Sequence, residues 1–414
     1  MCEVEIQSYP NLRTCTLGFV THRGAAHDTI AGSTQVLLQT IFRGTRNYTE
    51  SDIAKMIDGT GGSLFSTTEK DFTIIGAQVQ PKYAVNTLDL LFDSISNPLI
   101  EKTHFEIEKE KLLQTYYQVQ SNSLRRMILF DADKAVFGET HPLSRPQIGT
   151  PDSLSKLSIE TIQNTQQDLL IKPWGFAVGN ISQKLKTQLK QKFQEYLSTT
   201  ESSSKKLIPF PKREVPSKNI VTSLAREDGN AYLCINLITK SNPKIIGLAR
   251  FSSALLGESF GSRMFTILRD EKSFGYITGS TLKLIDDSLV LRFFMETKPS
   301  RTEEAIDTLT EIVIGLSKEE ISITEYNKTR DFLLGNLDLS FDDSRRIAAR
   351  IINRSVHGLS PDIEKGYKEI QSVTSEDVLS IWKTLCSPDK FSLAVVGNID
   401  PLKVQERWRN TQIS

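Results

Sequence analysis

The chain has 414 residues, of which 38% are hydrophobic and 24% are charged, an ordinary composition for a folded globular protein. Lys and Arg number 50 and Asp and Glu number 50, so the formal net charge at pH 7 is zero. This balance argues against a dedicated nucleic-acid binder or a binder of anionic membranes, because both normally carry a basic excess. At roughly 100–200 residues per domain, the length predicts two to four domains.

The N-terminal residues 1–6, MCEVEI, resemble neither a secretory signal nor a mitochondrial presequence, because they carry acidic residues and no basic stretch. The sequence has no run of about 18 apolar residues, so it predicts no membrane-spanning helix. We therefore expect a cytoplasmic protein. The four cysteines show no CxxC spacing and no two histidines stand four residues apart, so we expect reduced thiols and no metal site built from this chain alone.

Strands and helices alternate along the first half of the chain. Alternation of apolar and polar residues predicts strands, helical apolar spacing predicts helices, and a Ser or Thr followed by Glu predicts a helix start. The predicted elements, in chain order, are a strand over 72–80, helices over 83–95 and 104–117, a helix that starts within LSIETI at 157–162, a strand over 175–178 and a helix over 183–196.

A linker is predicted over 199–219, TTESSSKKLIPFPKREVPSKN, because Ser, Lys and three prolines occur there without periodicity. The basic pairs at 205–206 and 212–213 are interpreted as solvated linker residues.

The second half repeats the order of the first. VGNI at 178–181 recurs at 396–399. Around it, the predicted elements are a strand over 288–296, helices over 303–314 and 325–337, a helix that starts within VTSEDV at 373–378, a strand over 391–396 and a helix over 401–409. Self-similarity of this kind indicates an internal duplication.

We therefore predict an α+β protein with two homologous α/β-roll domains, over 1–198 and 220–414, joined by the linker 199–219. Each domain is expected to hold one sheet with helices packed on it. The two domains are expected to face each other and form a clam-like half-chamber.

Three stretches carry a family resemblance: GSTQVLLQTIFRGT at 32–45, DGTGGSLFSTT at 58–68 and HPLSRPQIG at 141–149. They resemble the family patterns G-[TS]-A-H-F-L-E-H-M-x-F-[KR]-G-T, E-x-x-G-G-x-x-N-A-x-T and H-P-L-G-R-P-x-x-G. The chain thus resembles the pitrilysin/insulinase family of zinc peptidases, which includes the mitochondrial processing peptidase and the core proteins of respiratory complex III. The length matches the short two-domain members.

The zinc-binding positions depart from that family. Its His-x-x-Glu-His motif places two imidazoles on zinc and a Glu as general base. Here Gln35 and Gln39 stand at the ligand positions and Leu38 at the base position. The resemblance places the third ligand, a Glu seven residues after Glu110, at Tyr117, or at the preceding tyrosine with a one-residue shift. We therefore expect no zinc in this chain.

The simplest structure for residues 35–39 is a plain amphipathic helix. We expect Val36, Leu37 and Ile41 to pack in the core, with the two Gln side chains in the space that ligands occupy in the family.

The second half keeps a different part of the resemblance. LLGESFGSRMFTILRDEKSFGY at 255–276 resembles the family stretch L-G-G-x-x-S-R-L-[FY]-x-x-[LV]-R-E-x-x-G-L-x-Y, with Arg269 and Tyr276 at its Arg and Tyr. In the family this pair contacts substrate near the zinc. We expect an apolar helix over 262–269 and a strand that begins at Tyr276. The alternative is that Arg269 caps the helix and Tyr276 lines the sheet.

The Gly-containing loop 257–262, GESFGS, is no phosphate loop, because no Lys follows at the spacing of such loops. It occupies the place of the Gly-rich substrate-gripping loop of the processing peptidase's non-catalytic subunit, but it is shorter.

The resemblance implies the non-catalytic subunit of a heterodimeric zinc peptidase, inactive alone, with a separately encoded partner that carries His-x-x-Glu-His and the zinc. This chain would supply Arg269, Tyr276 and one wall of a chamber for peptides. Two alternatives stay open: a structural scaffold resembling the complex III core proteins, and a homodimeric peptide-binding module.

Overall fold

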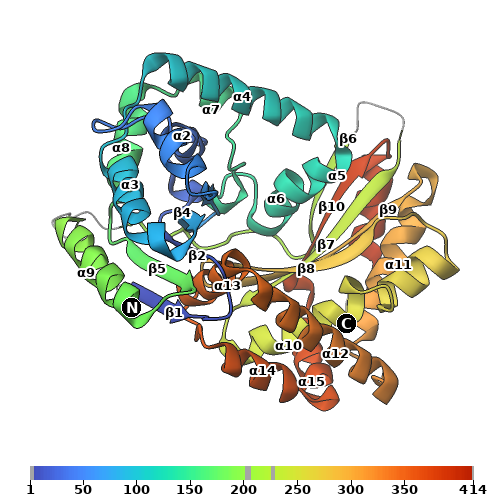
Figure 1. Ribbon diagram of the computed structural model, residues 1–414. Coiled ribbons are helices and arrows are strands. Elements are labelled where there is room, and N and C mark those ends of the chain that lie inside the picture. Colours follow the sequence, from blue (N-terminus) through green and yellow to red (C-terminus); the bar gives the residue numbers. More distant parts are fainter. Residues whose placement is uncertain (1–3, 201–206, 225–228, 413–414) are drawn as a thin grey trace. The chain divides into compact units, whose positions relative to one another are not determined.

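The structure, a computed structural model, describes residues 4–200, 207–224 and 229–412. Parts of two predictions, the N-terminal residues 1–3 and the linker residues 201–206, lie outside the described residues. Within them, the strands form two five-stranded sheets (Figure 1), ordered β1-β5-β2-β4-β3 and β6-β10-β7-β9-β8. The strands are β1 (Val4–Ser8), β2 (Cys15–Thr21), β3 (Ser63–Thr68), β4 (Thr73–Val79), β5 (Trp174–Gly179), β6 (Asn219–Leu224), β7 (Ala231–Lys240), β8 (Thr278–Ile285), β9 (Ser288–Thr297) and β10 (Phe391–Gly397).

Helices connect and cover these strands. In the first half they are α1 (Ser33–Thr40), α2 (Glu50–Asp58), α3 (Ala84–Ser96), α4 (Lys102–Ser121), α5 (Ser123–Arg126), α6 (Ala132–Phe137), α7 (Pro151–Ser155), α8 (Ile159–Leu169) and α9 (Gln183–Thr200). In the second half they are α10 (Pro243–Ser253), α11 (Thr302–Gly315), α12 (Ile323–Leu339), α13 (Ser344–Val356), α14 (Ile363–Gln371), α15 (Ser375–Leu385) and α16 (Pro401–Asn410). The π-helical turns are η3 (Met127–Asp131), η5 (Ala254–Glu258) and η6 (Phe265–Glu271).

The two sheets have the same topology, which confirms the α+β class and the two similar halves. In each sheet one outer strand pairs in parallel, β1 with β5 and β6 with β10, and the other pairs are antiparallel. The helices before β5 and β10 also begin alike, because Ser158 caps α8 and Thr374 caps α15 with a side-chain oxygen.

The repeated VGNI motif lies at the same place in both sheets, at the end of β5 and of β10. Its glycine leaves no room for a side chain. A Cβ at Gly179 would lie 2.3 Å from the Thr14 carbonyl oxygen, and one at Gly397 would lie 2.8 Å from Ala231 Cα. Gly179 also has a φ of +131°, which favours glycine.

The contacts between residues divide the chain into two compact units, each built from three separate segments of the sequence. Unit 1 comprises Met1–Tyr116, Pro146–Phe210 and Leu339–Pro361, and unit 2 comprises Tyr117–Arg145, Pro211–Asp338 and Asp362–Ser414. Strands β1–β5 lie before the predicted linker 199–219 and β6 begins at its last residue, Asn219, but α13 joins unit 1 and α6 joins unit 2. Neither α6 nor α13 is among the helices predicted from the sequence, so the sheet that each one covers was not predicted either.

In unit 1 the two sheet faces differ. The apolar face packs against a core with α3, α8 and α9. The other face combines polar residues such as Thr16 and Gln78 with the apolar residues Phe176 and Val178, and it contacts α13. There Ser344 Oγ lies 2.8 Å from Thr16 Oγ1, and Gln78 donates to Asp343 at 2.8 Å. Polar side chains can face a buried helix here because they bond to it.

Unit 2 is built in the same way. Its main core includes Trp382 of α15 and Trp408 of α16, both fully buried. On the opposite sheet face, Met127, Ala132 and Ala135 pack against Cys234, Ala394 and Val396. A buried ion pair between Arg292 on β9 and Asp133 on α6 fixes this contact.

A buried polar network holds the N-terminus of α1 in unit 1. Arg23 Nη1 lies 3.1 Å from Asp28 Oδ1, and the Thr34 amide donates to Asp28 Oδ2 at 3.0 Å. Arg23 and Asp28 are both buried. Breaking such a pair from one side typically costs about 3–5 kcal/mol, because the remaining charge stays buried without its partner.

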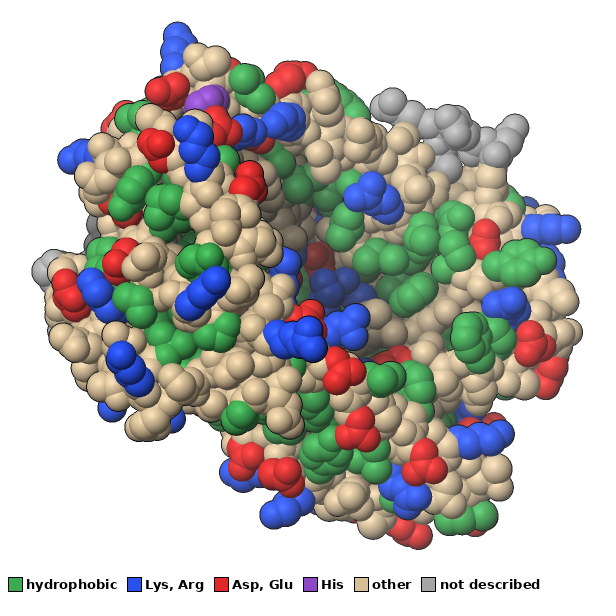
Figure 2. Space-filling model, in the orientation of Figure 1, with side chains coloured by type: hydrophobic (Ala, Val, Ile, Leu, Met, Phe, Trp, Pro, Cys, Tyr) green, Lys and Arg blue, Asp and Glu red, His purple; other side chains and the backbone are tan. Residues whose placement is uncertain are grey.

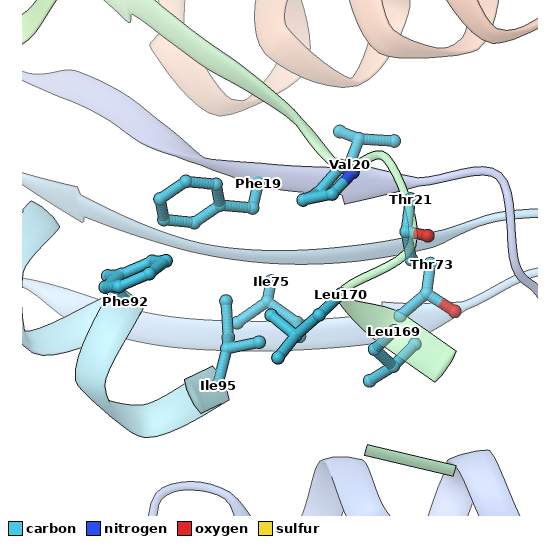
Figure 3. A pocket seen from close by; sticks show the side chains of 10 residues that line it. Phe19, Val20, Thr21, Thr73, Ile75, Phe92, Ile95, Leu169 and Leu170 are labelled. Atoms are coloured by element: carbon cyan, nitrogen blue, oxygen red, sulfur yellow. The ribbon is translucent and has the colours of Figure 1, made fainter. Parts of the chain in front are cut away.

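An apolar pocket in unit 1 is too small to be a ligand site. Its lining side chains come from β2, β4, α3 and the end of α8 (Figure 3), and its volume is about 10 Å³, the lower limit for one water molecule. We interpret it as a packing gap.

Among the described helices, none is long and apolar enough to cross a membrane.

His27 lies beside the polar network at α1. Its Nδ1 accepts a hydrogen bond from the Gly24 amide at 3.2 Å, and its ring lies 4.3 Å from that of Phe210. Burial, and next the charge of Arg23, lower the pKa of His27 from 6.5 to about 4. The folded state therefore holds this imidazole neutral at pH values where the unfolded chain protonates it.

We predict that the free energy of unfolding falls as the pH drops from about 6.5 towards 4, because the unfolded state then binds the extra proton. For one such group the slope is at most about 1.4 kcal/mol per pH unit. Urea unfolding at pH 7 and pH 5 measures it. His27→Gln should lose less stability between these pH values than the unmodified chain, and an equal loss would contradict this assignment.

Candidate functional site

The helix at the zinc-motif position, α1, is held by its apolar residues. Val36, Leu37 and Ile41 are buried in the unit 1 core, as predicted. Leu38, at the position of the family's general base, is 2% exposed and belongs to the same core. The helix is therefore stable through packing and needs no metal.

The residues at the ligand positions do not fit zinc. Gln35 is half-buried and Gln39 is exposed, and both end in neutral amides. Tyr117 lies on α4 and is 53% exposed. Structural and catalytic zinc sites use Cys, His, Asp or Glu donors, and none of these types stands at the three positions. Across the described ranges, no three side chains of those types gather in a group that could hold a metal ion.

His141, in the HPLSRPQIG stretch, has a structural role in unit 2. Its Nδ1 accepts from the Leu143 amide at 3.1 Å, and its Nε2 lies 2.9 Å from the Pro211 carbonyl oxygen. The ring stacks on that of Phe137 at 5.6 Å. With both ring nitrogens engaged, His141 holds the segment around Pro211 against the end of α6.

Arg269 and Tyr276 lie side by side in unit 2. The Arg269 guanidinium carbon is 4.5 Å from the Phe265 ring centre and 5.3 Å from the Tyr276 ring centre. The guanidinium therefore contacts both rings in cation–π geometry. Tyr276 is 81% exposed, so its phenol is open to a ligand.

Within the described part of the chain, the structure gives Arg269 no ion pair and no hydrogen bond from its guanidinium. Contact with two rings fixes the direction of the group while its N–H donors stay available. A planar guanidinium in this state suits a carbonyl or carboxylate acceptor.

The turn that joins the two residues is fixed by a different arginine. Arg301 Nη1 donates to the carbonyl oxygens of Lys272 at 3.0 Å and Ser273 at 3.4 Å, and its guanidinium lies 4.0 Å from the Phe274 ring centre. Ser273 has a φ of +51°, a left-handed conformation that a non-glycine residue adopts only when its surroundings hold it.

Two local predictions need correction here. The predicted helix over 262–269 continues as the π-helical turn η6 to Glu271. Tyr276 does not begin a strand, because β8 starts two residues later, at Thr278. Between the helix and β8 the chain makes a left-handed turn at Ser273, and Arg301 binds the carbonyl oxygens of this turn, so the strand starts only after Tyr276.

The loop 257–262 carries an exposed aromatic residue next to this pair. The Glu258 carboxylate accepts hydrogen bonds from Arg250 and from Ser253 Oγ, so it joins the loop to α10. Phe260 is 82% exposed, and its ring meets that of Phe265 edge-on at 5.1 Å.

Sequence reasoning missed the aromatic contacts of Arg269. Phe265 and Arg269 stand four residues apart on one helix, a spacing that predicts contact and could have revealed this pair. Phe260 and Arg301 carry no such signal, since they reach the site through the tertiary fold.

Acidic and basic side chains are interspersed over the face shown in Figure 2, without a broad field of one sign. That face thus lacks the basic surface that nucleic acid requires.

Comparisons with known proteins agree with the fold and with the family resemblance of the motifs. A sequence model described as Insulinase (Peptidase family M16) matches residues 3–150, and one described as Peptidase M16 inactive domain matches residues 175–333. The uncharacterized zinc protease YmxG of Bacillus subtilis is 22% identical over 404 residues, 95% of each protein. The probable mitochondrial-processing peptidase subunit beta of Schizosaccharomyces pombe is 20% identical over 432 residues, 99% of this chain and 92% of that protein.

Among solved structures, a protease from Helicobacter pylori superposes with a TM-score of 0.84 at 15% sequence identity, over 95% of this chain and 96% of that one. The duplicated sheet topology, the spacing of the motif remnants and these matches lead to one conclusion: the chain belongs to the insulinase family, peptidase family M16.

Proposed function

We propose that this chain is the non-catalytic subunit of a heterodimeric zinc metallopeptidase. It supplies Arg269, Tyr276 and half of a peptide-degrading chamber to a family partner that carries His-x-x-Glu-His and the zinc. The observation that carries the proposal is a contrast: the zinc-ligand positions hold Gln35, Gln39 and Tyr117, whereas Arg269 and Tyr276 form an ordered, accessible pair.

The pair has the chemistry that peptide hydrolysis needs opposite a metal. The Arg269 guanidinium can donate two N–H bonds to a peptide carbonyl and align the substrate backbone. The Tyr276 hydroxyl can donate to the oxyanion that forms when water attacks the carbonyl carbon. A donor fixed before the reaction stabilises that charge without reorganisation. In this proposal, every proton and metal step besides that donation belongs to the partner.

The comparisons support a partner of the same family. One matched family model is described as an inactive domain, and one relative is named as a subunit of a processing peptidase. A chain that keeps the family fold without zinc donors is consistent with a division of labour between two such subunits.

The isolated chain should bind no stoichiometric zinc and cleave no peptide, because all three ligand positions lack metal donors. Metal analysis of the purified chain and a peptidase assay check this. The triple variant Gln35→His, Leu38→Glu and Gln39→His should bind zinc weakly at best, since a third protein ligand is still missing. One tightly held zinc per unmodified chain would refute the assignment.

Tyr276→Phe should lower turnover by the assembled complex by about 100–1,000-fold, the usual effect of removing one oxyanion donor. The assay uses the chain co-expressed with the zinc-bearing partner, and assembly and zinc content should not change. If turnover stays the same, the phenol takes no part in the reaction and the chain acts as a scaffold or wall.

Arg269→Lys should raise KM and lower kcat, because an ammonium keeps the charge but loses the planar two-donor geometry and the contact with both rings. Lys272→Ala is the matched control: it removes an exposed cation three residues away and should leave both constants unchanged. Equal kinetics for Arg269→Lys and the control would show that position 269 does not contact substrate.

A further inference from the structure

Glu296 lies where strand β9 meets the segment that carries Tyr276. It is on β9, opposite Ile277, whose carbonyl oxygen accepts from the Glu296 amide at 2.8 Å. Its residue exposure is 9%, so the carboxylate is largely withdrawn from water. A carboxylate at this depth needs strong hydrogen-bond donors to offset its lost hydration.

The donors come from the backbone of the Tyr276 segment. Glu296 Oε2 accepts from the Tyr276 amide and from the Ile277 amide, each at 3.1 Å. The other oxygen, Oε1, accepts from the Asn230 side-chain amide. Within the described residues, the structure gives Glu296 no ion pair with Lys, Arg or His. One carboxylate therefore holds two consecutive backbone amides at the residue that carries the phenol.

The neighbouring residues leave room for this arrangement. A Cβ at Gly275 would lie 2.9 Å from Glu296 Cγ and 3.0 Å from its Oε2, so a side chain there would displace the carboxylate. Tyr232 is the cross-strand neighbour of Glu296 on β7, and burial, next the charge of Glu296 and then a hydrogen bond to its carboxylate raise the pKa of the Tyr232 phenol.

A strand start does not require such a residue. Exposed amides before an edge strand can bond to water at little cost, whereas a withdrawn carboxylate carries a desolvation penalty. The bonds do, however, fix the φ and ψ angles around Tyr276. The phenol is 81% exposed and has few packing contacts, so its direction depends on the backbone and on the ring contact with Arg269.

We propose that Glu296 is the positioning residue for Tyr276: by holding the amides of Tyr276 and Ile277, its carboxylate aims the phenol at the substrate oxyanion. This inference rests on the proposed function, because it gives the carboxylate its effect through the Tyr276 hydroxyl. Glu296 itself touches no substrate.

The test is a double-mutant cycle in the complex assembled with the zinc-bearing partner. Glu296→Gln keeps the size of the side chain but replaces the carboxylate by a neutral amide, so the two backbone amides keep an oxygen to bond to but lose its negative charge. We expect kcat to fall by about 10–100-fold, the scale of a small misplacement of a catalytic group, with KM changed less than twofold. In a Tyr276→Phe background the same change should alter kcat by less than about twofold, because no hydroxyl is left to misplace.

A second measurement needs no partner. Hydrogen exchange of the isolated chain should show faster exchange of the Tyr276 and Ile277 amides in Glu296→Gln, since the neutral amide oxygen is a weaker acceptor than the carboxylate oxygen. Glu303→Gln, an exposed carboxylate at the start of α11, is the matched control and should change neither exchange nor kcat. Thermal unfolding of each variant confirms that it is folded. If Glu296→Gln does not fold, Glu296→Asp replaces it, because it keeps the charge and shortens the reach.

The outcomes separate the two proposals. Suppose that Tyr276→Phe lowers kcat and that Glu296→Gln lowers kcat by the same factor with and without the Tyr276 hydroxyl. The carboxylate then acts on general structure, and the positioning role is overturned. If Glu296→Gln leaves kcat unchanged while Tyr276→Phe lowers it, the positioning role is again overturned and the proposed function stands. If Tyr276→Phe itself has no effect, both fail, and faster amide exchange then reports a purely structural bond.

Discussion

Each of the two sheets has a second face that must be covered, and in both compact units a helix from the other half of the chain covers it. Polar and small residues of the first sheet bond to α13 through Ser344 and Asp343. The second sheet receives α6, whose Asp133 pairs with the buried Arg292. Because each half completes the other, neither sheet has its full cover from its own half alone, and the fold depends on this exchange rather than on a bound metal.

This dependence explains how the zinc chemistry can be absent while the architecture remains. Helix α1 is anchored by the buried Arg23–Asp28 pair at its N-terminus and by Leu38 in the core, neither of which is a metal ligand. In unit 2, hydrogen bonds and ring contacts hold the short segment 265–276. Phe265 orients Arg269 and Arg301 fixes the turn that follows. These contacts fix the segment from Phe265 to Tyr276, whose Arg269 and Tyr276 we propose to contact substrate.

The sequence alone predicted the duplication, the strands β4, β5, β9 and β10, many of the helices and the altered zinc motif, because these depend on local periodicity and on residue types at fixed spacing. The N-caps at Ser158 and Thr374 are local in the same sense. It predicted neither α6 nor α13, and a helix pattern shows an apolar face but not the sheet that this face covers. The contacts of Arg269 with Phe265, and of Glu296 with the backbone before β8, were also missed. The four-residue spacing of Phe265 and Arg269 on one helix does indicate their contact. The contact of Glu296 joins residues that only the pairing of β8 with β9 brings together.

The central claim is that catalysis by the family partner requires this chain. The most direct test is a titration: a fixed amount of the zinc-bearing family member from the same genome is mixed with increasing amounts of this chain, and the rate of peptide hydrolysis is measured. The account predicts that the rate rises and levels off at one chain per zinc-bearing partner, with zinc content constant throughout. A partner that cleaves peptide at its full rate alone, and does not respond to the added chain, would contradict the account.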